Sequence, residues 1–229
     1  MPRGVMGAVE AASRSQGGGD ELIVEQDARA IIRLLGDGGA EDVLFGVFNF
    51  HASGNATSFE DKGICLRELG EDCRWCAENL QRRAMLVCWV WVKSIIHPQQ
   101  KLSTWEPVEI RGRGRAFKED VDAPKILRKG IGKGRAFLEL FVNYFQEYGA
   151  LNNRDYVLSR TGAGFDTNYS LVPRGDASAL TPDQERAKSQ CKDILEYYRD
   201  QAAGRAAVAT DNTIDLEDEE DDDGDEPPF

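Results

Sequence analysis

The sequence predicts a mainly β domain with flanking helices, arranged as a small, partly open β-barrel that carries a metal-stapled insertion. Three observations support this prediction. Short runs rich in aromatic and β-branched residues recur along the chain between glycine-containing turns. Few segments have the apolar period of an amphipathic helix. Histidine and cysteine residues between two of the predicted strands recur at the spacing of a metal site.

The first predicted strands cover residues 22–24 and 28–35. The Gly-Asp-Gly-Gly sequence at 36–39 ends the second of them in a turn. Residues 43–51, Val-Leu-Phe-Gly-Val-Phe-Asn-Phe-His, are predicted to form the next strand because they are rich in aromatic and β-branched residues. This strand places His51 at its end.

Four residues form the candidate metal site: His51, Cys65, Cys73 and Cys76. The two residues between Cys73 and Cys76 allow both thiolates to reach one ion from a single turn, and the other two residues complete one nitrogen and three sulfur ligands. A Cys-x2-Cys pair alone also occurs in redox sites, and the four residues could be unrelated, but the added histidine and cysteine favour zinc. Four protein ligands leave no open position for water, so we expect a structural zinc and no zinc-dependent catalysis.

Residues 85–93 are predicted to form a strand with two apolar faces. The odd-numbered positions from Met85 to Trp91 share one face, and the even-numbered positions from Leu86 to Val92 share the other. We expect at least one of the two tryptophans on the odd-numbered face to pack in the core, the alternative being a position that faces a ligand.

Residues 105–117 are predicted to form a single strand with a basic face, on which Arg111, Arg113 and Arg115 lie with Phe117. Three arginines in register beside an aromatic ring could follow a phosphate backbone while a base stacks nearby. The alternative is a solvent-facing strand whose charges only keep the protein soluble. The binding interpretation is favoured because the same charge continues in Lys118, Lys125, Arg128, Lys129, Lys133 and Arg135.

Glycine-rich residues 130–134 lead into a predicted helix over 135–148, whose aromatic stripe we expect in the core. The loop lacks the first glycine of a Walker phosphate loop, and Gly134 stands where that motif needs Ser or Thr after the lysine. Residues 155–160 are the last predicted strand, and a loop follows it to Tyr169.

A capping box predicts the final helix: Thr181 precedes Pro182 and is followed three residues on by Gln184, and the helix should run to about residue 201. The chain is accordingly divided into a disordered arm (1–20), a β domain (21–175) with a zinc subdomain (about 51–84), a C-terminal helix (176–203), and a linker with a disordered acidic tail (204–229).

The net charge of −12 is concentrated in the tail, where residues 211–229 hold eleven acidic residues and no basic one, so that the rest of the chain carries only −1. Residues 111–135 form the opposite extreme, with nine Lys or Arg against three acidic residues. Runs of one sign are often only solvated tails. A basic patch and an acidic tail in one molecule indicate an anionic ligand and a tail that imitates it.

Several classes of protein are disfavoured. No run of 18 apolar residues occurs, which argues against a membrane span, and the first 19 residues lack the apolar stretch of a signal peptide. The odd number of cysteines, five, indicates a reducing compartment. Two functions remain as alternatives: binding of single-stranded nucleic acid, and a zinc-stabilised protein-interaction or transcription-control module. A metal nuclease fits least, because the carboxylates lie mostly in the tail.

A family resemblance covers residues 28–201. It rests on Ala-Ile-Ile-Arg-Leu-Leu at 30–35, Phe-Asn-Phe-His at 48–51, the cysteine spacing with its short helix, the Trp-rich strand, Gly-Arg-Ala-Phe at 134–137, and the residues from Tyr156 through Arg160 to Tyr169. In these features the chain resembles the zinc-containing single-stranded DNA-binding proteins of tailed bacteriophages, of the T-even helix-destabilising type.

The resemblance implies an OB-fold whose groove holds single-stranded DNA, with a zinc subdomain bracing one wall. It implies His51, Cys65, Cys73 and Cys76 as zinc ligands, and it adds Arg160 and Tyr169 to the DNA-binding residues. The implied role is not enzymatic: sequence-independent binding and protection of single strands in phage DNA replication, recombination and repair, in the cytoplasm of the bacterial host.

Two features depart from or extend this family. Residues 1–20 contain only two basic residues, Arg3 and Arg14, whereas the type protein uses a basic arm for cooperative binding. The chain ends in Asp-Glu-Pro227-Pro228-Phe229, which resembles the tip of bacterial single-stranded DNA-binding proteins. That resemblance implies docking to replication proteins, such as a polymerase, helicase, primase or recombinase, through these last three residues.

Overall fold

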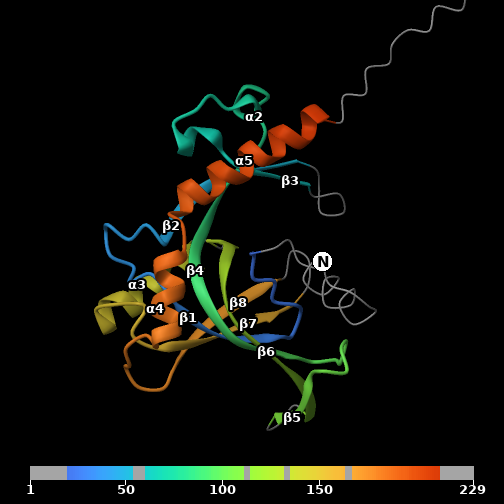
Figure 1. The fold of residues 1–229 in the computed structure, drawn as a ribbon, viewed down its shortest axis with the longest axis vertical. Helices are drawn as coiled ribbons and strands as arrows, with labels where there is room; N and C mark the ends of the chain where they lie inside the picture. The colour runs from blue at the N-terminus through green and yellow to red at the C-terminus, as the bar shows by residue number, and fades with distance from the viewer. Residues whose placement is uncertain (1–19, 54–59, 111–113, 132–134, 163–166, 212–229) are drawn as a thin grey trace, which may run out of the picture.

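The structure, a computed structural model, describes residues 20–53, 60–110, 114–131, 135–162 and 167–211 (Figure 1). Its strands are β1 (Arg29–Leu34), β2 (Phe45–Ser53), β3 (Glu60–Ile64), β4 (Arg82–His97), β5 (Glu106–Ile110), β6 (Gly114–Gly130), β7 (Asp155–Thr161) and β8 (Asn168–Arg174). Its helices are the 3-10 helix η1 (Leu66–Leu69) and the α-helices α2 (Arg74–Ala77), α3 (Ala136–Tyr148), α4 (Pro182–Gln190) and α5 (Ile194–Asp211). The mainly β architecture is therefore confirmed. None of the described helices is both long and apolar enough to cross a membrane.

The strands form one antiparallel sheet organised on β4, which is 16 residues long. One edge of β4 pairs first with β2, from Arg82 to Cys88, and then with β1, from Val90 to Ile96. The other edge pairs with β6, which also pairs with β5. β7 and β8 extend the sheet beyond β1, and β3 extends it beyond β2. Within the described residues no backbone pairing closes the sheet into a barrel.

β4 separates two hydrophobic cores, because its side chains alternate between the two faces of the sheet. The even-numbered residues from Leu86 to Val92 belong to a core that α3 covers with Phe137 and Phe141. Val87 and Trp89 belong to a second core, which is completed by β2, η1 and α5. The two predicted faces of this strand are thus confirmed. Trp89 is a core residue, and its indole Nε1 donates a hydrogen bond to the carbonyl oxygen of Lys192 at 2.9 Å.

The single strand predicted over residues 105–117 is wrong: the chain forms a hairpin of β5 and β6 there. Gly114 has a φ of +81°, a conformation that glycine adopts at no steric cost and that suits a reversal. Val108 lies opposite Ala116, and Glu109 lies opposite Arg115. Opposed residues of a hairpin share a face, so even-numbered and odd-numbered residues lie on different faces in the hairpin just as they would in one strand. The alternation in the sequence therefore does not distinguish the hairpin from a single strand.

Other predictions at the ends of the domain need correction. Residues 22–24 form no strand, and the isolated bridge beside them joins the preceding residue, Glu21, to Ile126. The segment expected to be a loop continues into β8, an edge strand that tolerates Pro173 because the missing N–H weakens no interior ladder. The expected linker after residue 203 instead continues α5 to Asp211.

The helix predicted to start at Thr181 starts there but is divided in two. Its capping box is present: the Gln184 N–H donates to Thr181 Oγ1 at 3.3 Å, and the Thr181 N–H donates to Gln184 Oε1 at 3.0 Å. α4 ends at Gln190, and the backbone of the next residue, Cys191, is extended. Asp193 then accepts a hydrogen bond from the Leu195 N–H at 2.6 Å, which starts α5 in a new direction.

Candidate metal centre and nucleic-acid interface

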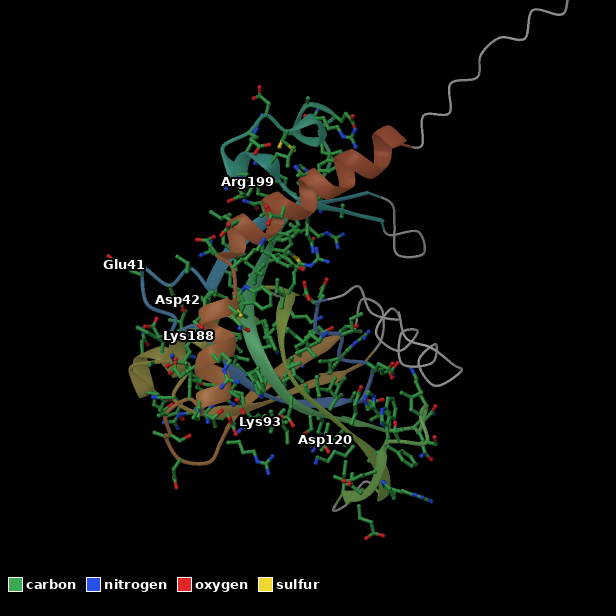
Figure 2. All side chains as sticks on the ribbon, in the orientation of Figure 1. Glu41, Asp42, Lys93, Asp120, Lys188 and Arg199 are labelled. Atoms are coloured by element: carbon green, nitrogen blue, oxygen red, sulfur yellow. The ribbon has the colours of Figure 1, made fainter. Side chains whose placement is uncertain are left out.

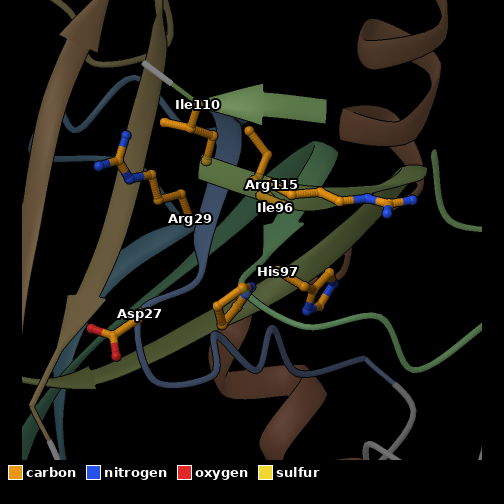
Figure 3. Close-up of a pocket in the computed structure, with 8 residues that line it drawn as sticks. Asp27, Arg29, Ile96, His97, Ile110 and Arg115 are labelled. Carbon is orange, nitrogen blue, oxygen red and sulfur yellow. The ribbon is translucent and has the colours of Figure 1, made fainter. Parts of the chain in front are cut away.

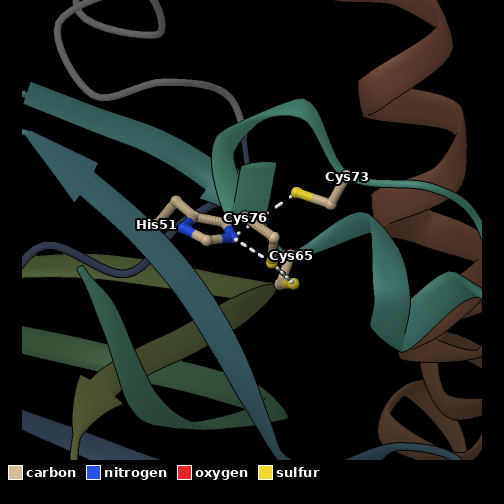
Figure 4. Close-up of side chains that lie close together, drawn as sticks. All are labelled: His51, Cys65, Cys73 and Cys76. Atoms are coloured by element: carbon tan, nitrogen blue, oxygen red, sulfur yellow. Dashed lines mark hydrogen bonds between the residues drawn. The ribbon is translucent and has the colours of Figure 1, made fainter. Parts of the chain in front are cut away.

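The four predicted metal ligands come together at the end of the β2–β3 hairpin (Figure 4). His51 lies on β2, and Cys65 follows β3 directly; its N–H donates to the Asn49 carbonyl oxygen at 2.8 Å, which holds it beside β2. Cys73 and Cys76 lie just before and within α2. The Cys-x2-Cys turn is closed by the Cys76 N–H, which donates to the Cys73 carbonyl oxygen at 3.1 Å.

The distances between the ligand atoms suit a tetrahedral ion. His51 Nε2 lies 3.4 Å from the Sγ atoms of both Cys73 and Cys76, and Cys65 Sγ lies 3.5 Å from Cys76 Sγ. All four atoms lie within 4.8 Å of one another. A tetrahedral zinc with ordinary bond lengths requires about 3.6 Å between nitrogen and sulfur and about 3.8 Å between sulfurs. The cluster can hold a metal ion and is compatible with structural zinc.

The surroundings of the thiols also suit a metal. Burial raises the pKa of Cys65 to about 11. Burial also acts to raise the pKa of Cys73, but backbone hydrogen bonds from Cys76, Leu66 and Trp75 outweigh it, so the net direction is downward. A bound cation favours the thiolate form that ligates it. His51 turns Nε2 toward the sulfurs, and its buried Nδ1 has no hydrogen-bond partner among the described residues.

A second cluster joins three predicted DNA-binding residues: Lys129, Arg160 and Tyr169. Arg160 of β7 and Tyr169 of β8 are a directly opposed cross-strand pair. Lys129 near the end of β6 places its Nζ 5.1 Å from the centre of the Tyr169 ring. The ring of Phe137, at the start of α3, lies 6.1 Å from that of Tyr169 and supports it from the core side. The cluster therefore combines two cations with a half-buried aromatic ring.

The two cations are poorly compensated within this part of the protein. Burial lowers the pKa of Lys129; Glu21 acts in the opposite direction, while Arg160 and Arg128 reinforce the lowering. Arg160 donates from Nη1 to the Val24 carbonyl oxygen at 3.1 Å, and its buried Nε has no hydrogen-bond partner in the part of the chain that the structure describes. Among the described residues neither cation has a carboxylate within ion-pair distance. Such a site favours an anionic ligand over water.

The other predicted DNA-binding residues have different environments. Arg115 is exposed and lies over the Phe117 ring at 5.4 Å, so this basic–aromatic pair is present. Lys118 instead forms an ion pair with Asp120 at 2.6 Å. Arg135 is exposed at the start of α3. Outside the described residues lie Arg111, Arg113, Lys133, Pro227, Pro228 and Phe229.

The prediction did not include a buried ionic network around Asp155. This carboxylate accepts from Arg33 Nε at 2.7 Å and from Lys93 Nζ at 2.6 Å. Arg33 is only 4% exposed and also donates to the Ser178 carbonyl oxygen at 3.0 Å. The network fixes the segment before α4 to the sheet, which is a structural role. A lone arginine in an apolar strand gave no signal of it in the sequence.

One of the hollows has the wrong charge for a nucleic acid. It lies between the β1–β2 connection and α4, where Figure 2 shows Glu41 and Asp42 on the same side of the molecule as Lys188. Asp37 and Glu185 also line it. Four carboxylates against one lysine would repel phosphate, so this hollow is not a candidate for the DNA path.

No protein-family model and no curated protein sequence matches the chain. The metal cluster and the basic–aromatic cluster are therefore the observations that bear on function.

Proposed function

We propose that the protein binds single-stranded DNA without sequence preference, on an OB-fold-like, partly open barrel braced by a structural zinc. The observation that carries this proposal is the cluster of Lys129, Arg160 and Tyr169, in which two poorly compensated cations lie beside an aromatic ring. Unpaired bases stack on such rings whatever their identity, while cations neutralise the phosphates on either side.

The zinc would act on the fold and not on the DNA. His51, Cys65, Cys73 and Cys76 would hold it, and the ion would supply cross-links in a segment that has little other structure. η1 and α2 are only four residues each, yet Leu69 of η1 is buried in the second core. A metal can supply the stability that such short helices lack.

The wider role that we propose follows the resemblance to the phage proteins. The protein would coat and protect single strands during phage DNA replication, recombination and repair, in the cytoplasm of the bacterial host. Its acidic tail would recruit replication proteins, with Pro227, Pro228 and Phe229 as the docking tip. An apolar terminal residue after an acidic run suits a basic pocket with an apolar floor on such a partner.

Fluorescence anisotropy with labelled oligothymidylate, and with a duplex of the same length, tests the proposal. We expect the single strand to bind more tightly. Tyr169→Leu and Lys129→Gln should each weaken binding by roughly tenfold. Arg186→Gln is the matched control, because Arg186 is an exposed cation on α4 that is already paired with Asp183 at 3.2 Å.

The outcome that rejects the proposal is a wild-type protein that binds neither nucleic acid or prefers the duplex. Equal binding by wild type and both cluster variants would also reject it. In either case a zinc-stabilised protein-interaction module would become the better interpretation.

A further inference from the structure

A pocket of about 300 Å³ lies where the start of β1, the end of β4 and the β5–β6 hairpin meet (Figure 3). Its apolar lining comes from Ile96, Pro98, Ile110 and Ala116. Arg29 is directly paired with Ile96 across β1 and β4, so both side chains project from the same face of the sheet. None of these residues belongs to either cluster described above.

One wall of the pocket is rigid because His97 is held in place. Its Nε2 lies 3.0 Å from Glu119 Oε2, and its ring stacks on Trp105 with 3.9 Å between centroids and 9° between planes. Glu25 lies on the other side of the imidazole, 3.8 Å from Nδ1. These contacts with Glu119, Trp105 and Glu25 hold the imidazole ring of His97 in one orientation. A wall that is fixed before binding reduces the entropy lost when a ligand enters.

Two arginines give the pocket its charge. Figure 3 shows the side chains of Arg29 and Arg115 extending to opposite sides, with Ile96 and Ile110 between them. Among the described residues neither guanidinium has an ion pair, and that of Arg115 lies over the Phe117 ring. The lining also includes the exposed carboxylate of Asp27. The pocket is therefore an apolar slot between two cations, with one acidic group on its rim.

The pocket adjoins the cluster of Lys129, Arg160 and Tyr169 through backbone hydrogen bonds. The Asp27 N–H donates to the Arg160 carbonyl oxygen at 2.9 Å, and the Arg160 N–H donates to the Ala28 carbonyl oxygen at 3.2 Å. The beginning of β1 therefore lies between the two sites. A DNA strand bound at one of these sites needs only to cross this end of the sheet to reach the other site.

We infer that the pocket takes one nucleotide of a bound single strand. The base enters between Ile96 and Ile110, and the phosphates on either side lie against Arg29 and Arg115. An apolar slot between two unpaired guanidinium groups matches the chemistry of a nucleotide unit, in which a flat base separates two anions. A paired base in a duplex cannot enter without leaving its stack. This inference rests on the proposed single-strand binding and adds Arg29, Ile96 and Ile110 to it.

Substitutions at three positions test the pocket, and they change DNA affinity in different directions. Arg29→Gln should weaken binding of labelled oligothymidylate and lower the salt slope by about 0.7, the value of one phosphate contact, and Arg29→Lys should restore the slope. Ile110→Ala should weaken binding by roughly tenfold without changing the slope. Asp27→Asn should strengthen binding by about two- to threefold, because it removes the acidic group among the described residues that line the pocket. Asn tolerates the φ of 61° found at Asp27.

The outcomes separate this inference from the proposed function. If the wild type does not bind single strands, the proposed function itself fails. If the wild type binds and Tyr169→Leu weakens binding, while Arg29→Gln and Ile110→Ala bind like the wild type, only the pocket is overturned. Far-ultraviolet circular dichroism and the thermal midpoint establish that each variant is folded. The Arg29 side chain makes no hydrogen bond with the described residues, so its replacement should leave both unchanged.

Discussion

Replacing Cys73 by serine should release the metal and unfold one segment while leaving most of the domain intact. Cys73 is 5% exposed, and its Sγ lies 3.4 Å from His51 Nε2. Without the metal, the segment from Ile64 to Leu80 keeps little to hold it. Its large contribution to the second core is Ile64 and Leu69, which are 4% and 9% exposed. Exposing two such side chains costs about 3–6 kcal/mol, which is the expected loss of unfolding free energy in Cys73→Ser.

The first core should survive this change, because it contains no residue between Ile64 and Leu80. Hydrogen exchange detected by mass spectrometry checks the prediction: protection should fall in this segment and persist in β1 and β7. Elemental analysis should show one zinc per wild-type chain and none in the variant. Cys191→Ser is the control. Cys191 lies outside the ligand group, so this variant protein should keep its metal. Unchanged metal content in Cys73→Ser, or loss of protection in β1 and β7 together with the segment, would refute the reasoning.

Four further predictions concern binding and stability. In salt titrations by anisotropy, Lys129→Gln should lower the slope by about 0.7, whereas Tyr169→Leu should reduce affinity and leave the slope unchanged; equal slopes in both variants would contradict these roles. Burial lowers the pKa of Lys129, and only its protonated form attracts phosphate. As the pH rises, DNA affinity should therefore begin to decrease at a pH below that at which an ordinary lysine loses its proton; Lys129→Arg should remove this loss in a pH series. Thr181→Ala should reduce the unfolding free energy by about 1 kcal/mol in urea titrations, since the capping box is lost, and a change near zero would argue against it. Truncation after residue 210 should tighten DNA binding most at low salt, because eleven competing negative charges are removed, and identical affinity at low salt would reject the tail as a DNA mimic.

The sequence predicted the metal ligands and the two faces of β4 because both depend on short-range spacing. His51 and the three cysteines meet through one hairpin and one turn, and alternation alone divides the residues from Leu86 to Val92 between two cores. Features that depend on long-range pairing could not be predicted. Arg33 and Asp155 are 122 positions apart, and only the folded sheet brings them to 2.7 Å.

Other features were missed because two structures share one pattern. The β5–β6 hairpin preserves the alternation of a single strand, since Glu109 and Arg115 lie opposite each other on one face. The break between α4 and α5 depends on Asp193, whose side chain caps the second helix in a stretch that otherwise reads as one helix. The pocket beside Arg29 had no sequence signal at all, because its lining comes from three separate segments.

The central position of β4 has a consequence for the order in which the protein folds during synthesis. β2, β3 and β4 are consecutive in the chain, so their pairing and the metal cluster can form as soon as residues up to 97 have left the ribosome. β1 must pair on its other side with β7, where Arg29 lies opposite Ser159, so the first core has to wait for a partner made much later. We expect the metal-binding lobe to be the first folded unit on the nascent chain, whereas the odd-numbered face of β4 stays partly uncovered until Ile194 and Tyr198 of α5 have been made.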